Sequence, residues 1–392
     1  MRFLIITLVF PVVGFSQAQF SRGFDANEAR EMILLCNSFT YLDLYGDDRA
    51  ILPAGYTRTY TSPVVGMDNL FQVYTKGTVG VLNFRGSTDK KASWLENIYS
   101  TMIPIQGTIQ VQDKEFEYAF GTDTAANIHS GYALSMAYLY EDIVAQIQQL
   151  NSKGIYKIYL TGHSQGGALA IMTRAYLEFK AKASISSKND FKVYTFAQPM
   201  SGNAAFVRQY NREFCETGKS YSLINPEDLV PTMPMSYNDS TFVRDNLVAL
   251  LSKDQEVDKG KMLRDGLMLL FEEKLGGTVE KFGTAVSKQI QKELGHVRMP
   301  EPAHGINYAQ VGNIIQLAPP EYPLELKDSS ILTNTDFLKE HPRDQNGIFI
   351  NKAVYKKPSM GLQHKPYNYY TAVLRKYFPK EYAKVEPKSF RL

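Results

Sequence analysis

Residues 158–170 read Ile158-Tyr159-Leu160-Thr161-Gly162-His163-Ser164-Gln165-Gly166-Gly167-Ala168-Leu169-Ala170, and this stretch decides the fold. Its apolar beginning is typical of a buried strand, its small residues of a turn, and its end of a helix. A serine on such a sharp turn has a strained backbone, so the residues two before and two after it must lack side chains. Gly162 and Gly166 meet that need. The segment predicts a nucleophile at Ser164 and a following helix whose positive N-terminal end can stabilise an oxyanion.

Strand and helix patterns alternate on both sides of this segment. Predicted strands occupy 156–161, 192–197, 220–225 and 311–317, and helical patterns occupy 24–46, 131–150, 165–182 and 203–215. Residues 71–74 and 79–84 flank Lys76-Gly77, which is typical of a hairpin with a tight turn. Alternation of this kind predicts an α/β fold with a mostly parallel central sheet covered by helices.

Residues 240–296 break the alternation. They contain no convincing strand and carry apolar side chains at helical spacing, namely Leu263, Leu267, Leu270, Phe271, Val279, Phe282, Val286 and Ile290. This predicts a helical insertion whose apolar stripes face a lipid surface, roof a pocket or pack on the body of the protein. The chain has 392 residues and no linker or repeat, so residues 19–392 are predicted to form a single domain that carries this insertion.

The first residues carry the pattern of an export signal. Met1-Arg2 is followed by the apolar run 3–13 and by small residues at Ser16 and Ala18. Residues 1–18 are therefore predicted to be a signal peptide, and the mature chain is predicted to begin at Gln19. No later stretch approaches the roughly eighteen apolar residues that a membrane span requires. We expect a secreted or periplasmic protein with no transmembrane segment.

Composition limits the classes of partner. A formal net charge of +3 is too small to indicate nucleic-acid binding. No His, Cys or Asp cluster has metal-ligand spacing and no G-x-G-x-x-G follows a strand, so neither a metal nor another cofactor is predicted. The two cysteines, Cys36 and Cys215, either form one disulfide or stay as separate buried thiols.

Two further residues are needed to activate the serine. A hydroxyl needs a base to remove its proton, and that base is usually an imidazole held by a carboxylate. In hydrolases with this strand–turn–helix segment, the acid and then the histidine follow the serine. Asp228 fits the acid because it comes shortly after the predicted strand 220–225, and both His304 and His364 follow it. His129 and His163 are predicted to be structural, with His163 pointing away from the nucleophile.

Five short motifs resemble those of the class 3 lipases, the family of fungal triacylglycerol lipases and related plant acylglycerol lipases. In chain order they are Phe84-Arg85-Gly86-Ser87, Ile128-His129-Ser130-Gly131-Tyr132, the turn from Gly162 to Gly167, Phe196-Ala197-Gln198-Pro199-Met200-Ser201-Gly202-Asn203, and Asp228-Leu229-Val230-Pro231. The resemblance implies an α/β-hydrolase fold in which Ser164 is the nucleophile and Asp228 orients the base. It also implies an oxyanion hole formed by Ser87 and the backbone N–H of Gln165.

The resemblance favours His364 over His304 as the base. In this family a strand that often carries a Val-Gly pair lies between the acid and the base, and Val311-Gly312 follows His304 in such a strand. His364 stands in a loop that enters a final helix and is followed a few residues later by tyrosines, as in the family's terminal motif. Such a loop can hold an imidazole over the nucleophile.

The chain departs from the family at several positions. Gln165 stands where a leucine is common, and Ala197, Gln198 and Met200 replace the usual glycine and arginine. None of these changes removes a catalytic group. Residues 94–98 resemble the lid of the family, but residues 102–127 are longer and more polar than a minimal lid. A lid triggered by a lipid surface therefore stays an open alternative.

Together the motifs imply an exported serine ester hydrolase that cleaves acylglycerols or related carboxylic esters through an acyl-enzyme intermediate. The expected partner is a lipid or other ester substrate, with transient contact with a lipid surface as a further expectation and no nucleic acid. A phospholipase and a feruloyl-type esterase are alternatives that share this fold and triad. A lipid-binding protein of the same fold that catalyses no reaction is the alternative from another class.

Overall fold

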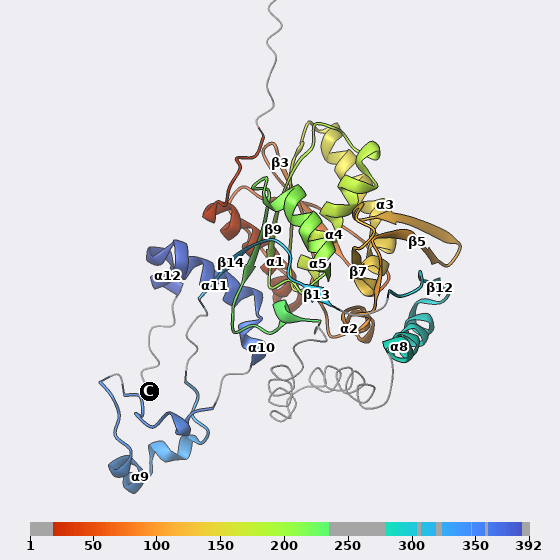
Figure 1. The fold of residues 1–392 in the computed structure, drawn as a ribbon. Helices are drawn as coiled ribbons and strands as arrows, with labels where there is room; N and C mark the ends of the chain where they lie inside the picture. Colours follow the sequence, from red (N-terminus) through yellow and green to blue (C-terminus); the bar gives the residue numbers. More distant parts are fainter. Residues whose placement is uncertain are drawn as a thin grey trace, which may run out of the picture.

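The computed structural model of the chain describes residues 19–234, 279–303, 307–318, 324–345, 347–356 and 360–385 (Figure 1). The predicted signal peptide, His304 and most of the predicted insertion, up to residue 278, lie outside the described residues. Among the residues that are described, no helix is long and apolar enough to cross a membrane.

A seven-stranded sheet forms the centre of the fold. Its strands, in order across the sheet, are β1 (Thr57–Thr61), β2 (Phe71–Lys76), β3 (Val79–Phe84), β8 (Lys157–His163), β9 (Asp190–Phe196), β11 (Ser220–Ile224) and β14 (Asn313–Gln316). The strands from β1 to β3 pair antiparallel, whereas those from β3 to β14 pair in parallel. The predicted hairpin, strands and mostly parallel sheet are therefore confirmed.

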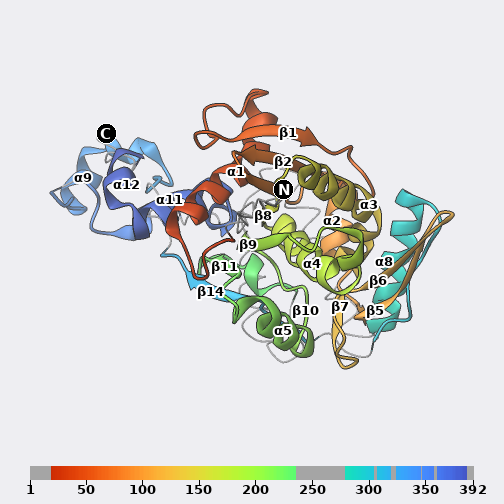
Figure 2. The same ribbon diagram turned by 90° about the horizontal axis from the view of Figure 1, so that it is seen from above.

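Helices cover both faces of this sheet (Figure 2). One face carries α1 (Ala26–Tyr45) and α11 (Pro366–Tyr377), and the other carries α3 (Ser130–Ser152), α4 (Gln165–Phe179) and α5 (Ala204–Tyr210). Successive side chains of a strand point to opposite faces, so β8 gives Ile158 and Leu160 to the α4 side and Tyr159 to the α1 side. The four predicted helices are confirmed, and the last of them continues beyond α5 as the π-helical turn η2 (Asn211–Cys215).

Two smaller sheets complete the described strands. One contains β13 (Tyr308–Ala309), β10 (Gly202–Asn203), β7 (Asn127–His129) and β4 (Met102–Pro104), and the other contains β12 (Val297–Arg298), β5 (Gln106–Val111) and β6 (Lys114–Ala119). The polar segment 102–127, which is longer than a minimal lid, therefore folds largely as strands.

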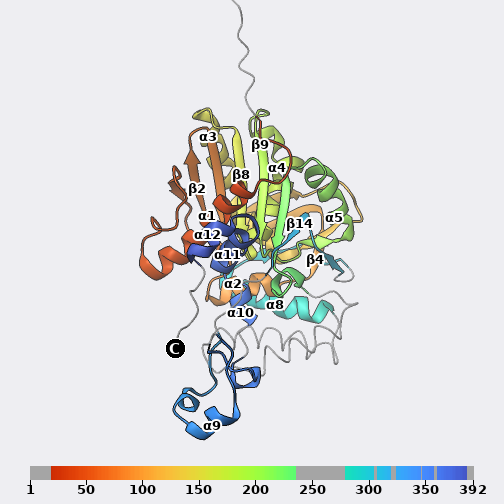
Figure 3. The ribbon, with the colours of Figure 1, turned by 90° about the vertical axis from the view of Figure 1, so that its left-hand side faces the viewer.

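Three helices gather at one end of the central sheet, namely α2 (Lys91–Ile98), α8 (Val279–Leu294) and α10 (Met360–Gln363) (Figure 3). The described part of the predicted insertion is helical, since it contains α8, which contacts α2 through an ion pair of 2.9 Å between Lys91 Nζ and Glu293 Oε1. The remaining short elements are η1 (Lys182–Ser184), η3 (Val230–Thr232), η4 (Ser329–Leu332), α9 (Thr335–Glu340), η5 (Lys352–Val354) and α12 (Pro379–Val385).

Both cysteines are buried and unbridged. Cys36 Sγ lies 3.6 Å from Thr161 Oγ1 on β8, and Cys215 Sγ donates to Asn211 Oδ1 at 3.2 Å. Burial raises the pKa of each thiol to about 12. Of the two alternatives left by the sequence, the structure contains the pair of separate buried thiols.

Candidate active site

The turn between β8 and α4 presents Ser164 at the carboxyl end of the parallel strands. Ser164 has φ 60° and ψ −134°, a backbone conformation that residues other than glycine rarely adopt. A Cβ atom at Gly162 would lie 2.3 Å from the Gly166 backbone, and one at Gly166 would lie 2.1 Å from the Phe84 carbonyl oxygen. The turn can form only because both positions lack side chains.

Three side chains from distant parts of the chain meet at this turn. His364 lies between α10 and α11, and its Nε2 is 2.8 Å from Ser164 Oγ. Its Nδ1 is 2.8 Å from Oδ2 of Asp228, which lies in the loop after β11. The predicted nucleophile, base and acid are thus in hydrogen-bond contact, while their catalytic roles stay a prediction. The other candidate base, His304, is not among the described residues.

Asp228 is almost fully buried, and its hydrogen bonds fix its orientation. Oδ1 accepts the backbone N–H of Val230 at 3.0 Å, and Oδ2 accepts the hydroxyl of Tyr369 at 2.8 Å in addition to His364. The Tyr369 oxygen in turn accepts the backbone N–H of Asn225 at 3.0 Å. α11 therefore supplies a second donor to the acid, a role that the sequence analysis did not assign to any tyrosine.

The residue before the base is bound to the same loop after β11. Gln363 Oε1 accepts the side-chain amide of Asn225 at 2.6 Å, and Gln363 Nε2 donates to Glu227 Oε2 at 3.0 Å. These two contacts and the Asp228–His364 contact connect α10 to the acid loop, so the imidazole and the carboxylate are positioned together.

His163, the residue before the nucleophile, lies against the candidate base. The centroids of the His163 and His364 rings are 4.7 Å apart, and the hydroxyphenyl ring of Tyr369 meets His163 edge-on at 5.5 Å. Burial first, and the charge of His364 second, hold the pKa of His163 well below its usual value. A neutral His163 therefore adds no positive charge beside the imidazolium that His364 would form.

Two backbone N–H groups are candidates for the oxyanion hole. Those of Ser87, after β3, and Gln165, the first residue of α4, donate to no acceptor in the part of the chain that the structure describes. Both follow the neighbouring parallel strands β3 and β8, whose carboxyl ends lie at the same end of the central sheet. The N-terminus of α4 also has a positive electrostatic potential, which stabilises a negative oxygen.

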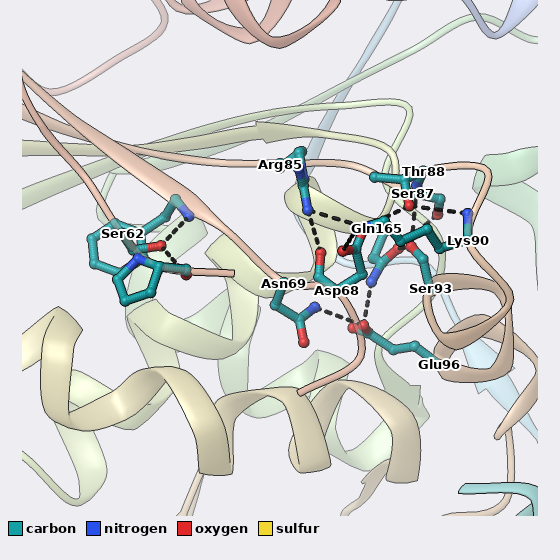
Figure 4. Close-up of polar contacts among 12 residues, drawn as sticks. Ser62, Asp68, Asn69, Arg85, Ser87, Thr88, Lys90, Ser93, Glu96 and Gln165 are labelled. Atoms are coloured by element: carbon teal, nitrogen blue, oxygen red, sulfur yellow. Dashed lines mark hydrogen bonds and ion pairs between the residues drawn. The ribbon is translucent and has the colours of Figure 1, made fainter. Parts of the chain in front are cut away.

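The loop that carries Ser87 is held by a carboxylate from the loop before β2 (Figure 4). Asp68 accepts the Thr88 hydroxyl at 2.6 Å and the Lys90 ammonium at 2.7 Å, and the Arg85 guanidinium lies 3.1 Å from its Oδ2. Burial opposes the charge of Asp68, but its hydrogen bonds from Lys90 and Thr88 still keep its pKa below the usual value. The loop is therefore anchored on both sides of Ser87.

A second polar cluster joins the oxyanion candidates to α2 (Figure 4). The Ser87 hydroxyl donates to Gln165 Oε1 at 2.6 Å, and the Gln165 amide nitrogen donates to the buried carboxyl group of Glu96. Asn97 Nδ2 donates to Ser87 Oγ at 2.9 Å. Sequence reasoning treated 94–98 only as a lid-like segment and missed this cluster. The available signal was the unusual polar residue at position 165, which needs a polar partner when buried.

The fold and the strained serine define the class of the protein. A sheet that is mostly parallel, with a strained serine turn between β8 and α4 and with an aspartate and a histidine later in the chain, is the α/β-hydrolase fold. The family is narrower. Residues 81–238 match the family described as lipase (class 3), which confirms the resemblance of the motifs in this part of the chain.

Several known lipases are similar to parts of the chain. Secreted mono- and diacylglycerol lipase 1 of Fusarium solani is 26% identical over 139 residues, which cover 34% of this chain and 39% of that protein. A lipase of Rhizomucor miehei is 28% identical over 153 residues, which cover 38% of this chain and 36% of that protein. The chain thus matches well under half the length of these relatives. A solved structure of a triacylglycerol lipase whose catalytic centre is a serine protease triad aligns at 23% identity and a TM-score of 0.40, covering 53% of this chain and 74% of that chain.

Proposed function

We propose that the protein hydrolyses carboxylic esters through an acyl-enzyme intermediate on Ser164. The observation that carries this proposal is the position of His364, whose Nε2 and Nδ1 each lie 2.8 Å from an oxygen, one of Ser164 and one of Asp228. An imidazole so placed can take the serine proton while the carboxylate stabilises the resulting imidazolium. The class 3 lipase match of residues 81–238 supports the same chemistry.

Acylation begins when Ser164 Oγ attacks the ester carbonyl carbon and its proton passes to His364 Nε2. The carbonyl oxygen becomes an oxyanion, which we assign to the N–H groups of Ser87 and Gln165. Collapse of the tetrahedral intermediate breaks the bond to the alcohol, and the alcohol leaves with the proton from His364. Water then attacks the acyl-serine with His364 again as base, which releases the carboxylic acid and restores Ser164.

We propose that the substrates are acylglycerols or related carboxylic esters. The protein hydrolyses them without a cofactor. The support is the named activity of the relatives, one of which is a mono- and diacylglycerol lipase described as secreted. Export of this chain, with residues 1–18 as signal peptide and Gln19 as the first mature residue, is part of the proposal. So is a single catalytic domain over residues 19–392.

The test combines active-site labelling with a substrate panel. A fluorescent alkyl phosphonate should label the wild-type protein and leave Ser164→Ala unlabelled, because the phosphonate bonds to the activated serine oxygen. Hydrolysis rates on monoacylglycerols, triacylglycerols, a phosphatidylcholine and methyl ferulate then identify the substrate class. Absence of both labelling and turnover in folded protein would overturn the proposal in favour of a lipid-binding protein. Fastest turnover of the phosphatidylcholine or of the ferulate would replace the acylglycerol assignment.

A further inference from the structure

Gln165 connects the two candidate oxyanion donors to each other. Its backbone N–H begins α4, while its side chain is almost fully buried beside the loop after β3. The side-chain oxygen accepts the Ser87 hydroxyl at 2.6 Å and the Ser93 hydroxyl at 3.2 Å. The separation between the N–H groups of Ser87 and Gln165 therefore depends on the direction in which one buried side-chain amide points.

Glu96 of α2 determines that direction. Its side chain is fully buried, and Oε2 accepts both the Gln165 amide nitrogen and, at 2.7 Å, Nδ2 of Asn69. A carboxyl oxygen that accepts two amides is not itself a donor, so the nitrogen of Gln165 faces Glu96 and its oxygen faces Ser87. With the amide reversed, the Gln165 oxygen would face the Glu96 oxygen, and Ser87 would lose its acceptor.

The surroundings of Glu96 fit an uncharged acid. Burial raises its pKa to about 8, and the groups that oppose this increase are Asn69, Ser135 and Gln165, none of which is a cation. The proton then belongs on Oε1, the buried oxygen that accepts no hydrogen bond from the described residues. A neutral carboxyl group has the same shape and the same acceptor oxygen as a glutamine amide, so glutamine at position 96 should preserve the cluster.

We propose that Glu96 and Gln165 are positioning residues for the oxyanion hole: Glu96 orients the Gln165 side chain, which holds Ser87 so that both backbone N–H groups converge on one oxygen. The inference rests on the proposed ester hydrolase function. It also gives the polar residue at position 165 a task that a leucine could not perform, because an apolar side chain cannot accept the Ser87 hydroxyl. Both side chains are buried and bind protein groups, so both act through Ser87 and α4.

The test measures oxyanion binding and turnover separately. Gln165→Leu and Glu96→Ala should each lower kcat on p-nitrophenyl butyrate about 10- to 100-fold while KM changes less than about threefold, since the lost interaction acts in the transition state. The affinity for a trifluoromethyl ketone, whose adduct with Ser164 carries an oxyanion, should fall by a similar factor. The kcat of the double variant should be no lower than that of the less active single variant, because the two side chains act as one unit.

Glu96→Gln is the rescue variant and should keep kcat within about threefold of wild type. Ile147→Ala, a core substitution near the C-terminal end of α3, is the stability control and should lower Tm with little effect on kcat. Unchanged kcat in Gln165→Leu, multiplicative losses in the double variant, or a loss in Glu96→Gln as large as in Glu96→Ala would each overturn the inference. If Glu96→Ala does not fold, Gln165→Leu and Glu96→Gln still decide it. Activity retained by Ser164→Ala would instead refute the proposed function itself.

Discussion

Tyr369 and His364 both contact one oxygen of the candidate acid, since each lies 2.8 Å from Oδ2 of Asp228. An ionised carboxylate only accepts hydrogen bonds, so His364 must carry its ring proton on Nδ1. In the neutral imidazole Nε2 is then the unprotonated nitrogen, and it faces Ser164 Oγ at 2.8 Å. The tautomer that a general base needs is therefore fixed by the acid, and Tyr369 shares in holding that acid.

Tyr369→Phe should lower kcat/KM about three- to tenfold, because Asp228 loses one of its donors and His364 is held less firmly. The change also leaves the buried N–H of Asn225 without its acceptor, so the free energy of unfolding should fall by about 1–2 kcal/mol. Ester hydrolysis and urea denaturation of the same preparation check both effects. Lower stability with unchanged kcat/KM would show that Tyr369 supports only the fold.

The two histidines that follow Asp228 should differ sharply when replaced. His364→Ala should lose roughly four to six orders of magnitude in kcat, nearly as much as Ser164→Ala, because members of a triad act as a unit. His304→Ala should keep most of its activity. Turnover of p-nitrophenyl butyrate, in protein purified free of contaminating esterase, measures all three variants. The reverse order of the two histidine variants would identify His304 as the base.

Ser87 should tolerate alanine better than proline. Ser87→Ala keeps the backbone N–H but loses the hydroxyl that binds Gln165 Oε1, so kcat should fall about tenfold. Ser87→Pro also removes the N–H donor, and we expect a loss of about 100- to 1,000-fold. Circular dichroism should show that both variants remain folded. Equal losses in the two variants would mean that the hydroxyl, and not the backbone, stabilises the oxyanion.

The sequence predicted those parts of the site that depend on short-range geometry. The glycines around Ser164 are required by the strained turn itself, and Ser164 and Asp228 lie near each other because each follows a strand of the parallel part of the sheet, β8 or β11. Helices and strands were predictable for a related reason, because two buried faces impose continuous apolar runs on β8 and its neighbours.

The sequence could not predict which polar side chains become buried together. Glu96 lies in a helix that resembles a lid, and its burial depends on contacts with Asn69 and Gln165, which are distant in the chain. Tyr369 is one of several tyrosines after His364, and only the position of α11 on the sheet selects it as the partner of Asp228. Such contacts follow from packing between elements, which periodicity and spacing do not encode.

The buried acid of Glu96 should make stability depend on pH. Its pKa is about 4.5 in the unfolded chain and about 8 in the fold, so the folded state holds a proton that the unfolded state releases. The contribution of protonated Glu96 to the free energy of unfolding is complete below pH 4.5. It is lost as pH rises towards 8, by at most about 5 kcal/mol. The facing groups are Asn69, Ser135, Gln165 and the phenol of Tyr132, whose own pKa is raised well above 10, so none of them titrates in this window.

Glu96→Gln cannot titrate, so urea denaturation at pH 5 and pH 8 should show the variant gaining stability relative to wild type at the higher pH. The same difference between the two proteins at both pH values would mean that Glu96 is already ionised in the folded protein.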